Sequence, residues 1–107
     1  MLDLVTGGAG FIGSHLTDRL LALGRTVRVV DNMEVGKPRN LEQHKGNPRL
    51  EVMVGDVADP AVMAKAMAGV ERVFHLAALA DIVPSIVNPE GYFRANVVGT
   101  FVTLQAA

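Results

Sequence analysis

Four glycines near the start of the chain are the first residues whose types and spacing could do chemistry. Gly8, Gly10 and Gly13 fit the pattern G-x-G-x-x-G, and Gly7, Gly10 and Gly13 fit T-G-x-x-G-x-x-G when Thr6 is included. They follow a short apolar run and precede a helical pattern. A strand, a glycine-rich turn and a helix in this order present unpaired backbone N–H groups to a pyrophosphate. The stretch predicts a dinucleotide-binding loop, and the alternative is an ordinary glycine-rich turn.

Asp31 is the second candidate, because it ends an apolar stretch 18 positions after Gly13. A carboxylate at this place in a dinucleotide-binding unit accepts hydrogen bonds from the ribose hydroxyls and repels a 2′-phosphate. We therefore expect NAD rather than NADP, although Lys37 or Arg39 could accommodate a 2′-phosphate. The alternative is a turn aspartate, since Asp31-Asn32 also suits a turn.

Two histidines are weaker candidates. His75, near the end of the fourth expected strand, could act as a base, but it has no partner nearby in sequence to tune it. We interpret it as a packed residue at the end of a strand. His15 could touch a phosphate, but a solvated position on a helix is the simpler interpretation. The chain has no cysteine, so no thiolate metal site is possible, and we predict no metal site.

The elements that must position these groups alternate along the chain. Hydrophobic periodicity and turn residues predict strands at 2–5, 26–30, 50–54 and 72–76. Helices are expected at 11–23, 38–44, from Pro60 until Gly69, and at 90–107, with a loop at 81–89. This order predicts an α/β fold with a parallel, Rossmann-type sheet, helices on both faces and the strand order 3-2-1-4.

Periodicity also predicts which helix faces are apolar. The first helix is expected to bury Ile12, Leu16, Leu20 and Leu23. The last helix has one apolar face with Asn96 beside it, made of Phe93, Val97, Thr100, Phe101 and Leu104.

Composition excludes several classes of protein. A chain of 107 residues with 50% apolar residues is one small domain at most and is expected to have a buried core. A net charge of −1 gives no basic footprint for nucleic acid. Apolar runs fall far short of the ~20 residues of a membrane span. Met1 leads directly into an expected strand, leaving no room for a signal peptide. We expect a soluble, cytoplasmic protein.

Five motifs in order carry a family resemblance: LVTGGAGFIGSHL, VVDN followed by Gly36 and Asn40, GDV, FHLAA and NVVGT. The chain resembles the extended short-chain dehydrogenase/reductase superfamily, and within it the NAD-dependent epimerase/dehydratase family that includes the UDP-glucose 4-epimerases. The resemblance covers essentially the whole chain.

The resemblance implies NAD as cofactor and a role for each matching position. The pyrophosphate would be held by Gly7, Gly10, Phe11 and Ile12, and the adenosine ribose by Asp31 and Asn32. Asp56 and Val57 would flank the adenine, with the Asp56 carboxylate accepting from its amine. The path to the nicotinamide would be lined by Leu76, Ala77, Ala78 and Ala80. Asn96 would bond backbone near the active site and shape the cofactor pocket.

The resemblance also implies partners: a nucleotide-sugar substrate, and a homodimer formed through helices that include residues 90–107. Catalysis in the family depends on a Ser/Thr and a Y-x-x-x-K pair. The only tyrosine is Tyr92, and four residues later stands Asn96 instead of lysine. Ser85 has no base near it in sequence. No catalytic residue is therefore expected among residues 1–107, and the chain alone is predicted to be inactive.

The end of the chain predicts a longer parent enzyme. The last helix reaches Gln105-Ala106-Ala107 without a cap, and only the first half of a dinucleotide-binding fold is present. We expect residues 1–107 to be the N-terminal part of an NAD-binding Rossmann domain, with the rest of the sheet and a substrate domain absent.

Three functions remain open. The parent enzyme could be a nucleotide-sugar epimerase or dehydratase that transfers a hydride transiently to bound NAD. It could instead be a reductase or dehydrogenase of the same superfamily. The 107 residues alone could be a non-catalytic nucleotide-binding module.

Overall fold

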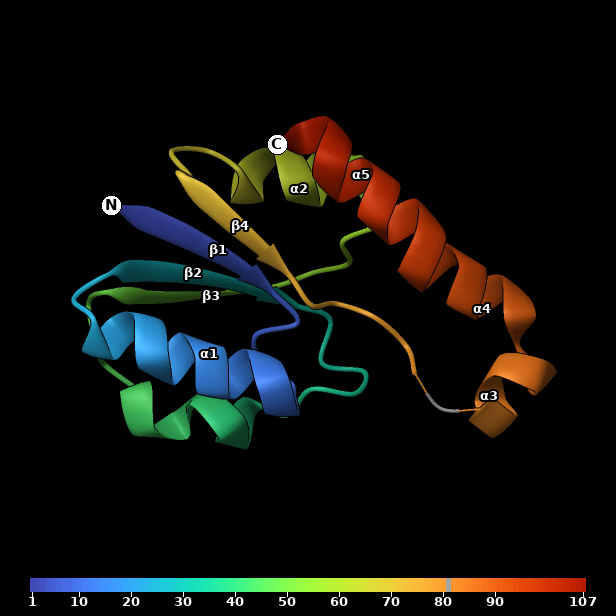
Figure 1. The fold of residues 1–107 in the computed structure, drawn as a ribbon, viewed down its shortest axis with the longest axis horizontal. Helices are drawn as coiled ribbons and strands as arrows, with labels where there is room; N and C mark the ends of the chain where they lie inside the picture. Colours follow the sequence, from blue (N-terminus) through green and yellow to red (C-terminus); the bar gives the residue numbers. More distant parts are fainter. Residues whose placement is uncertain (81) are drawn as a thin grey trace.

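Four parallel strands form the centre of the molecule (Figure 1). The computed structural model describes residues 1–80 and 82–107. The strands are β1 (Leu2–Thr6), β2 (Thr26–Asp31), β3 (Leu50–Val54) and β4 (Arg72–His75), in the order β3-β2-β1-β4. Every pairing is parallel, so all the carboxyl ends meet at one edge of the sheet. The predicted Rossmann-type sheet and its strand order 3-2-1-4 are confirmed.

Helices cover both faces of this sheet. The helices of the described residues are α1 (Phe11–Ala22), the 3₁₀ helix η1 (Pro38–His44), α2 (Pro60–Ala66), α3 (Ile82–Val87), α4 (Pro89–Phe93) and α5 (Gly99–Ala106), of which α3 and α4 lie beyond the carboxyl ends of the strands in Figure 1. A π-helical segment, Arg94–Val98, joins α4 to α5. In Figure 1, α1 lies on one face of the sheet, and α2 and α5 lie on the other. Among the described residues, no helix has both the length and the apolar character to cross a membrane.

Each face of the sheet has its own hydrophobic core, because successive side chains of a strand point to opposite faces. Val5, Val27 and Val29 pack with Leu20 and Leu21 of α1. Leu4 and Val30 belong to the second cluster, with Met63, Ala66 and Val102 from α2 and α5. These alternating strand residues hold the carboxyl edge of the sheet between two helical layers.

The buried face of α1 differs from the predicted one. Ile12 and Leu23 are 68% and 60% exposed, whereas Gly13 and Thr17 are buried with Leu20. A Cβ on Gly13 would overlap the backbone of Gly7 and Gly8, so the helix and the glycine-rich turn are in direct contact. Because the helix lies this close to the backbone, its small residues face inward and Ile12 is turned outward.

The loop predicted at 81–89 is also wrong for most of its length, because α3 occupies Ile82–Val87. Pro84 is its third residue, where a missing N–H costs nothing since the first N–H groups of a helix have no partner within it. Asn88 then caps α4, accepting a hydrogen bond from the Gly91 N–H at 3.2 Å. The predicted loop begins at Asp81, which lies outside the described residues.

Candidate functional site

The glycine-rich turn after β1 is built from backbone contacts. Gly7 has a φ of +70°, a conformation that other residues rarely adopt, and its N–H donates to the Val30 carbonyl of β2 at 2.8 Å. The Gly10 N–H donates to the Gly7 carbonyl at 3.1 Å, and Gly10 is the N-cap of α1 without a capping side chain. The N-terminus of a 12-residue helix therefore lies beside the sheet edge with no side chain capping it.

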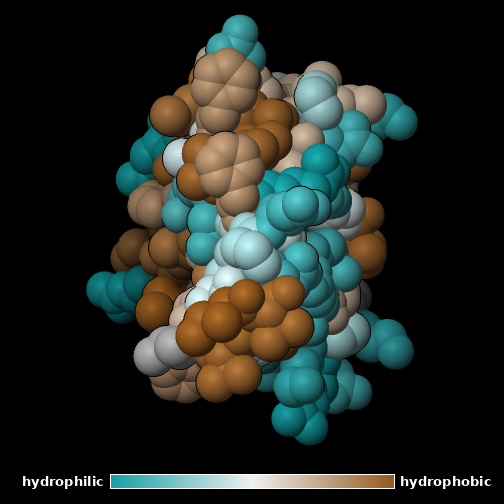
Figure 2. Space-filling model, turned by 90° about the vertical axis from the view of Figure 1, so that its right-hand side faces the viewer, coloured by the Kyte–Doolittle hydropathy of each residue, from teal (hydrophilic) through white to brown (hydrophobic). Residues whose placement is uncertain are grey.

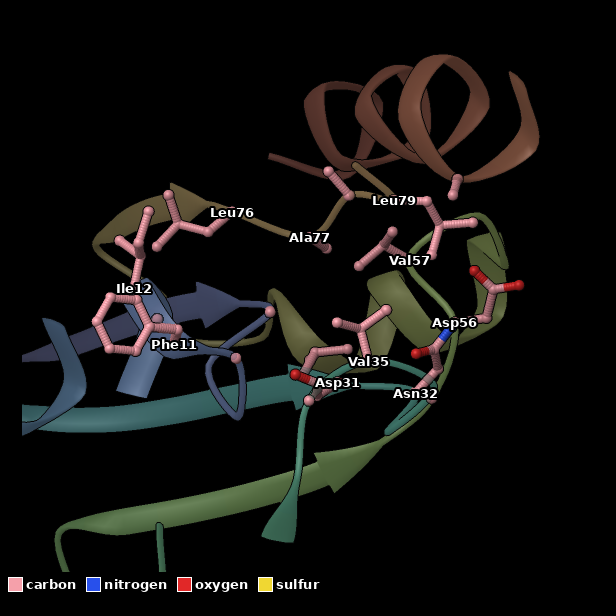
Figure 3. A pocket seen from close by; sticks show the side chains of 18 residues that line it. Phe11, Ile12, Asp31, Asn32, Val35, Asp56, Val57, Leu76, Ala77 and Leu79 are labelled. Atoms are coloured by element: carbon pink, nitrogen blue, oxygen red, sulfur yellow. The ribbon is translucent and has the colours of Figure 1, made fainter. Parts of the chain in front are cut away.

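This turn borders a cavity of about 330 Å³ at the carboxyl edge of the sheet. Figure 3 shows Phe11, Ile12 and Leu76 at one end in this view, and Asn32 and Asp56 at the other. A crevice at this edge is where open parallel sheets bind ligands. A second cavity, of about 460 Å³, lies between η1 and β3 and has no part of the glycine-rich turn in its lining.

Most residues assigned from the sequence line the first cavity together. They are Gly7, Gly10, Phe11, Ile12, Asp31, Asn32, Asp56, Val57, Leu76, Ala77 and Ala78. Ala80 and Asn96 are not in the lining. The cavity lining also includes residues to which the resemblance assigned no contact with the cofactor, namely Gly13, Val30, Val35, Gly36, Gly55, Leu79 and Ala95. Of these, Gly13, Val30, Gly36 and Gly55 had a signal, since all four belong to the quoted motifs.

Asp31 is almost fully buried, and both of its carboxylate oxygens accept hydrogen bonds from backbone. Oδ2 accepts from the Ala9 N–H at 3.0 Å and Oδ1 from the Met33 N–H at 2.8 Å. The first bond joins the carboxylate directly to the glycine-rich turn. Lys37 and Arg39, the two cations that could have favoured NADP, are exposed and do not line this cavity, and Arg39 borders the second one.

Asp56 lies at the far end of the cavity with an ion-pair partner that the sequence did not predict. Its Oδ1 accepts from the Ala58 N–H at 2.9 Å, and its Oδ2 lies 3.0 Å from Nη2 of Arg94. Arg94 begins the π-helical segment, 38 positions further along the chain. Both side chains are partly exposed, so the pair is solvent-accessible and contributes little to stability.

Asn96 does not line the cavity but forms hydrogen bonds with the backbone of a residue that does. Its Nδ2 donates to the Leu79 carbonyl and its Oδ1 accepts from the Leu79 N–H, both at 2.8 Å. Leu79 lines the cavity, so the half-buried amide fixes the chain that follows β4. π-Helical turns are rare and often occur at functional sites, and here one places Asn96 opposite Leu79.

His75 is confirmed as a packed residue at the end of a strand. The Thr6 hydroxyl accepts from the N–H groups of Leu76 and Ala77, so its own proton is directed to Nδ1 of His75 at 2.7 Å. Nε2 then lies 3.0 Å from the hydroxyl of Thr100. This arrangement fits a neutral ring, and burial lowers the pKa of His75. His15 is exposed and contacts the Phe11 ring.

The described residues contain no cluster of three or more His, Cys, Asp or Glu that could hold a metal ion. Tyr92 lies in α4 and Ser85 in α3. The predicted site therefore consists of backbone N–H groups, carboxylates and small residues, a set suited to binding a dinucleotide and orienting it.

Comparison with known proteins identifies the family. The model of the GDP-mannose 4,6 dehydratase family matches residues 4–107. UDP-glucuronic acid decarboxylase 2 of Arabidopsis thaliana is 45% identical over 97 residues, which cover 91% of this chain and 21% of that protein. UDP-glucose 4-epimerase of Haemophilus influenzae is 39% identical over 109 residues, covering 98% of this chain and 32% of that protein.

A solved structure agrees in fold. The dTDP-glucose 4,6-dehydratase of Streptomyces venezuelae, solved with NAD bound, superposes with a TM-score of 0.94 and 38% identity, covering all of this chain and 35% of that one. The chain thus spans about a fifth to a third of the length of these relatives. On the match over residues 4–107, the chain belongs to the GDP-mannose 4,6 dehydratase family of NAD-dependent epimerases and dehydratases.

Proposed function

We propose that the cavity beside the glycine-rich turn binds NAD, and that the chain is the cofactor-binding part of an enzyme that transforms nucleotide sugars. One observation carries the proposal. The bare N-terminus of α1 and the Asp31 carboxylate border the same cavity at the carboxyl edge of the sheet. One group favours a pyrophosphate and the other favours ribose hydroxyls.

The residues present fit this cofactor. A side chain at Gly10 would stand in front of the helix N-terminus, so its absence leaves space for phosphate oxygens. Asp31 and Asn32 would hold the adenosine ribose, and Asp56 and Val57 the adenine. The Asp56 side chain is 41% exposed and keeps acceptor capacity for an exocyclic amine besides its bond to Arg94.

Further along the cavity, Leu76, Ala77 and Ala78 would line the path to the nicotinamide, with Ala80 just beyond the lining. NAD bound there would supply reversible hydride-transfer chemistry for a sugar carbinol. The residues of this chain would bind and orient the cofactor. The relatives named above are decarboxylases, epimerases and dehydratases of nucleotide sugars, which supports a substrate of this class.

A reductase or dehydrogenase that uses NAD stoichiometrically is the alternative for the parent enzyme. Tight retention of NAD through purification would favour the epimerase or dehydratase, and stoichiometric release of NADH would favour the alternative. For residues 1–107 we propose binding without turnover, because the chain contains no Y-x-x-x-K pair. We also propose that these residues are the N-terminal part of the Rossmann domain of a cytoplasmic enzyme.

Titration calorimetry tests the cofactor assignment. We expect NAD to bind the 107-residue chain with a Kd between about 1 μM and 1 mM, and NADP to bind at least roughly tenfold more weakly. The double variant Lys37→Ala/Arg39→Ala should leave both affinities unchanged. A folded chain that binds neither NAD nor ADP-ribose would contradict the proposal, and equal affinity for NADP would contradict the role of Asp31.

We further propose that the parent enzyme is a homodimer through the helix of residues 89–106. The outward side of this helix carries a continuous apolar stripe of Phe93, Val97, Phe101 and Leu104, which are 52–71% exposed. Figure 2 shows apolar side chains gathered on the face that carries α3 and α4. Exposed apolar patches of this kind mark association surfaces.

Sedimentation measurements test the dimer. Self-association of the chain should weaken by about tenfold or more in Phe101→Lys, which places a charge in the stripe. Leu23→Lys is the matched control, because Leu23 is 60% exposed at the end of α1 and away from the stripe. A wild-type chain that stays monomeric at millimolar concentration would rule out this surface.

A further inference from the structure

We propose that Asn40, which does not line the cavity, is a positioning residue for the cofactor site. Through the carbonyl of Ala9 it holds the glycine-rich turn against the Asp31 carboxylate. This inference rests on the proposed NAD-binding function and deepens it, because it assigns the geometry of the binding loop to a residue of η1.

Ala9 is the junction of this arrangement. It is fully buried and does not line the cavity. Its N–H donates to Oδ2 of Asp31 at 3.0 Å. Its carbonyl accepts two hydrogen bonds, from the Lys37 N–H at 3.0 Å and from Nδ2 of Asn40 at 2.7 Å. Both polar groups of one residue in the turn are therefore bonded to the segment that begins at the end of β2.

The same segment is in van der Waals contact with the turn. A Cβ on Gly36 would lie 2.5 Å from Oδ2 of Asp31 and 2.9 Å from the Ala9 carbonyl carbon. Only a glycine lets the backbone pass this closely. Upstream, Met33 has a φ of +62° and donates its N–H to Oδ1 of Asp31, which turns the chain back toward the glycines.

Two side chains form hydrogen bonds with Ala9 in these contacts. The Asp31 carboxylate accepts from its N–H, and the Asn40 amide donates to its carbonyl. The backbone N–H of Asn40 donates to the Lys37 carbonyl at 3.0 Å, so the start of η1 fixes where its amide points. The peptide units on either side of Ala9 join it to Gly8 and Gly10, and Gly10 is one of the residues proposed to hold the pyrophosphate. The hydrogen bond to the Ala9 carbonyl thus orders the loop before the ligand binds. A preordered loop loses less conformational entropy on binding, so its affinity for the ligand is higher.

The test compares Asn40→Ala and Asn40→Asp with Asn47→Ala. Asn47 is a matched control, because its side chain also bonds to nearby backbone, accepting from the Arg49 N–H, but does not line the cavity. NAD affinity is measured at a temperature at which all variants are folded. We expect both Asn40 variants to weaken NAD binding by about tenfold, Asn40→Asp the more because its carboxylate faces the Ala9 carbonyl, and Asn47→Ala to bind as the wild type does.

Amide hydrogen exchange without ligand gives a second, independent readout. The Ala9 N–H should exchange about tenfold faster in Asn40→Ala, while the Val29 N–H in the middle of β2 keeps its wild-type rate. Equal acceleration at both sites would show a merely structural role and overturn the inference, as would unchanged NAD affinity in folded Asn40 variants. If the wild type does not bind NAD, the proposed function fails, and the exchange of Ala9 still decides the role of Asn40.

Discussion

At the scale of residues, the side chains around β1 and β4 form one chain of hydrogen bonds through His75. Thr6 donates to Nδ1, Nε2 faces Thr100, and the Thr100 hydroxyl donates to the Asn96 carbonyl at 2.6 Å. Protonation would add an N–H at Nδ1, where the Thr6 oxygen already accepts two backbone N–H groups. The neutral ring therefore links β1, β4 and the last helix.

This link predicts a pH dependence of stability. The folded pKa of His75 is lowered by burial from the ordinary value of 6.5. As pH falls through 6.5 toward the folded pKa, the unfolded chain binds more protons than the folded chain, so the free energy of unfolding decreases. Denaturant titrations between pH 7.5 and 5 should show this decrease. His75→Asn should show a smaller decrease in the free energy of unfolding over the same pH range. His15 and His44 are present in both proteins, so an equal decrease in wild type and variant would contradict the account.

The sequence was sufficient to predict the position, at the carboxyl edge of the sheet, of residues that directly follow or end a strand. Asp31 and Gly7–Gly13 could be placed because a parallel sheet brings the carboxyl ends of its strands together. It missed Arg94, because the contact with Asp56 depends on how the last helix lies across the sheet. It gave no role to Ala9, whose importance lies in backbone groups that every residue type shares.

At the scale of elements, the contact between α1 and the glycine-rich turn sets the site. The three atoms nearest to a Cβ on Gly13 would be backbone atoms of Gly7 and Gly8, which no rotamer change can move. A Cβ on Gly10 would meet one atom, the Gly7 carbonyl oxygen, at 3.2 Å. The two glycines differ in what they are needed for, since Gly13 allows packing and Gly10 leaves the helix N-terminus open.

This difference predicts separable effects of two substitutions. Gly13→Ala should lower the free energy of unfolding by roughly 2 kcal/mol, because overpacking outweighs the better helix propensity of alanine. Gly10→Ala should lower the free energy of unfolding by less than about 1 kcal/mol, but it should weaken NAD binding by about tenfold. Urea denaturation and calorimetry measure the two quantities. Equal losses of stability in the two variants would contradict the assigned roles.

The errors at this scale have a common physical cause. Periodicity assigns the larger apolar residues to the inner face of a helix, but α1 approaches the turn so closely that Gly13 and Thr17 face inward and Ile12 faces outward. Pro84 suggested a loop, yet it is accommodated in the first turn of α3. Both outcomes depend on packing distances and chain position that a sequence pattern does not contain.

At the scale of the whole molecule, two helical layers enclose a four-stranded sheet and leave its carboxyl edge hollow. The order of elements and the strand order could be predicted, because right-handed crossovers and alternating strands and helices leave few alternatives. The exposure of the apolar stripe on the last helix could not be predicted, because the same spacing of apolar residues is typical of a buried helix face.

The central claim is that NAD binds at this edge, in contact with the turn and Asp31. Titrating the isotopically labelled chain with NAD and following its amide signals by NMR tests this most directly. We predict the largest shifts in the segments 7–13, 31–36, 55–57 and 76–79, which contain most of the lining residues, with small shifts around Leu41 and Leu50 of the second cavity. The absence of shifts at saturating NAD, or shifts concentrated at the second cavity, would contradict the account.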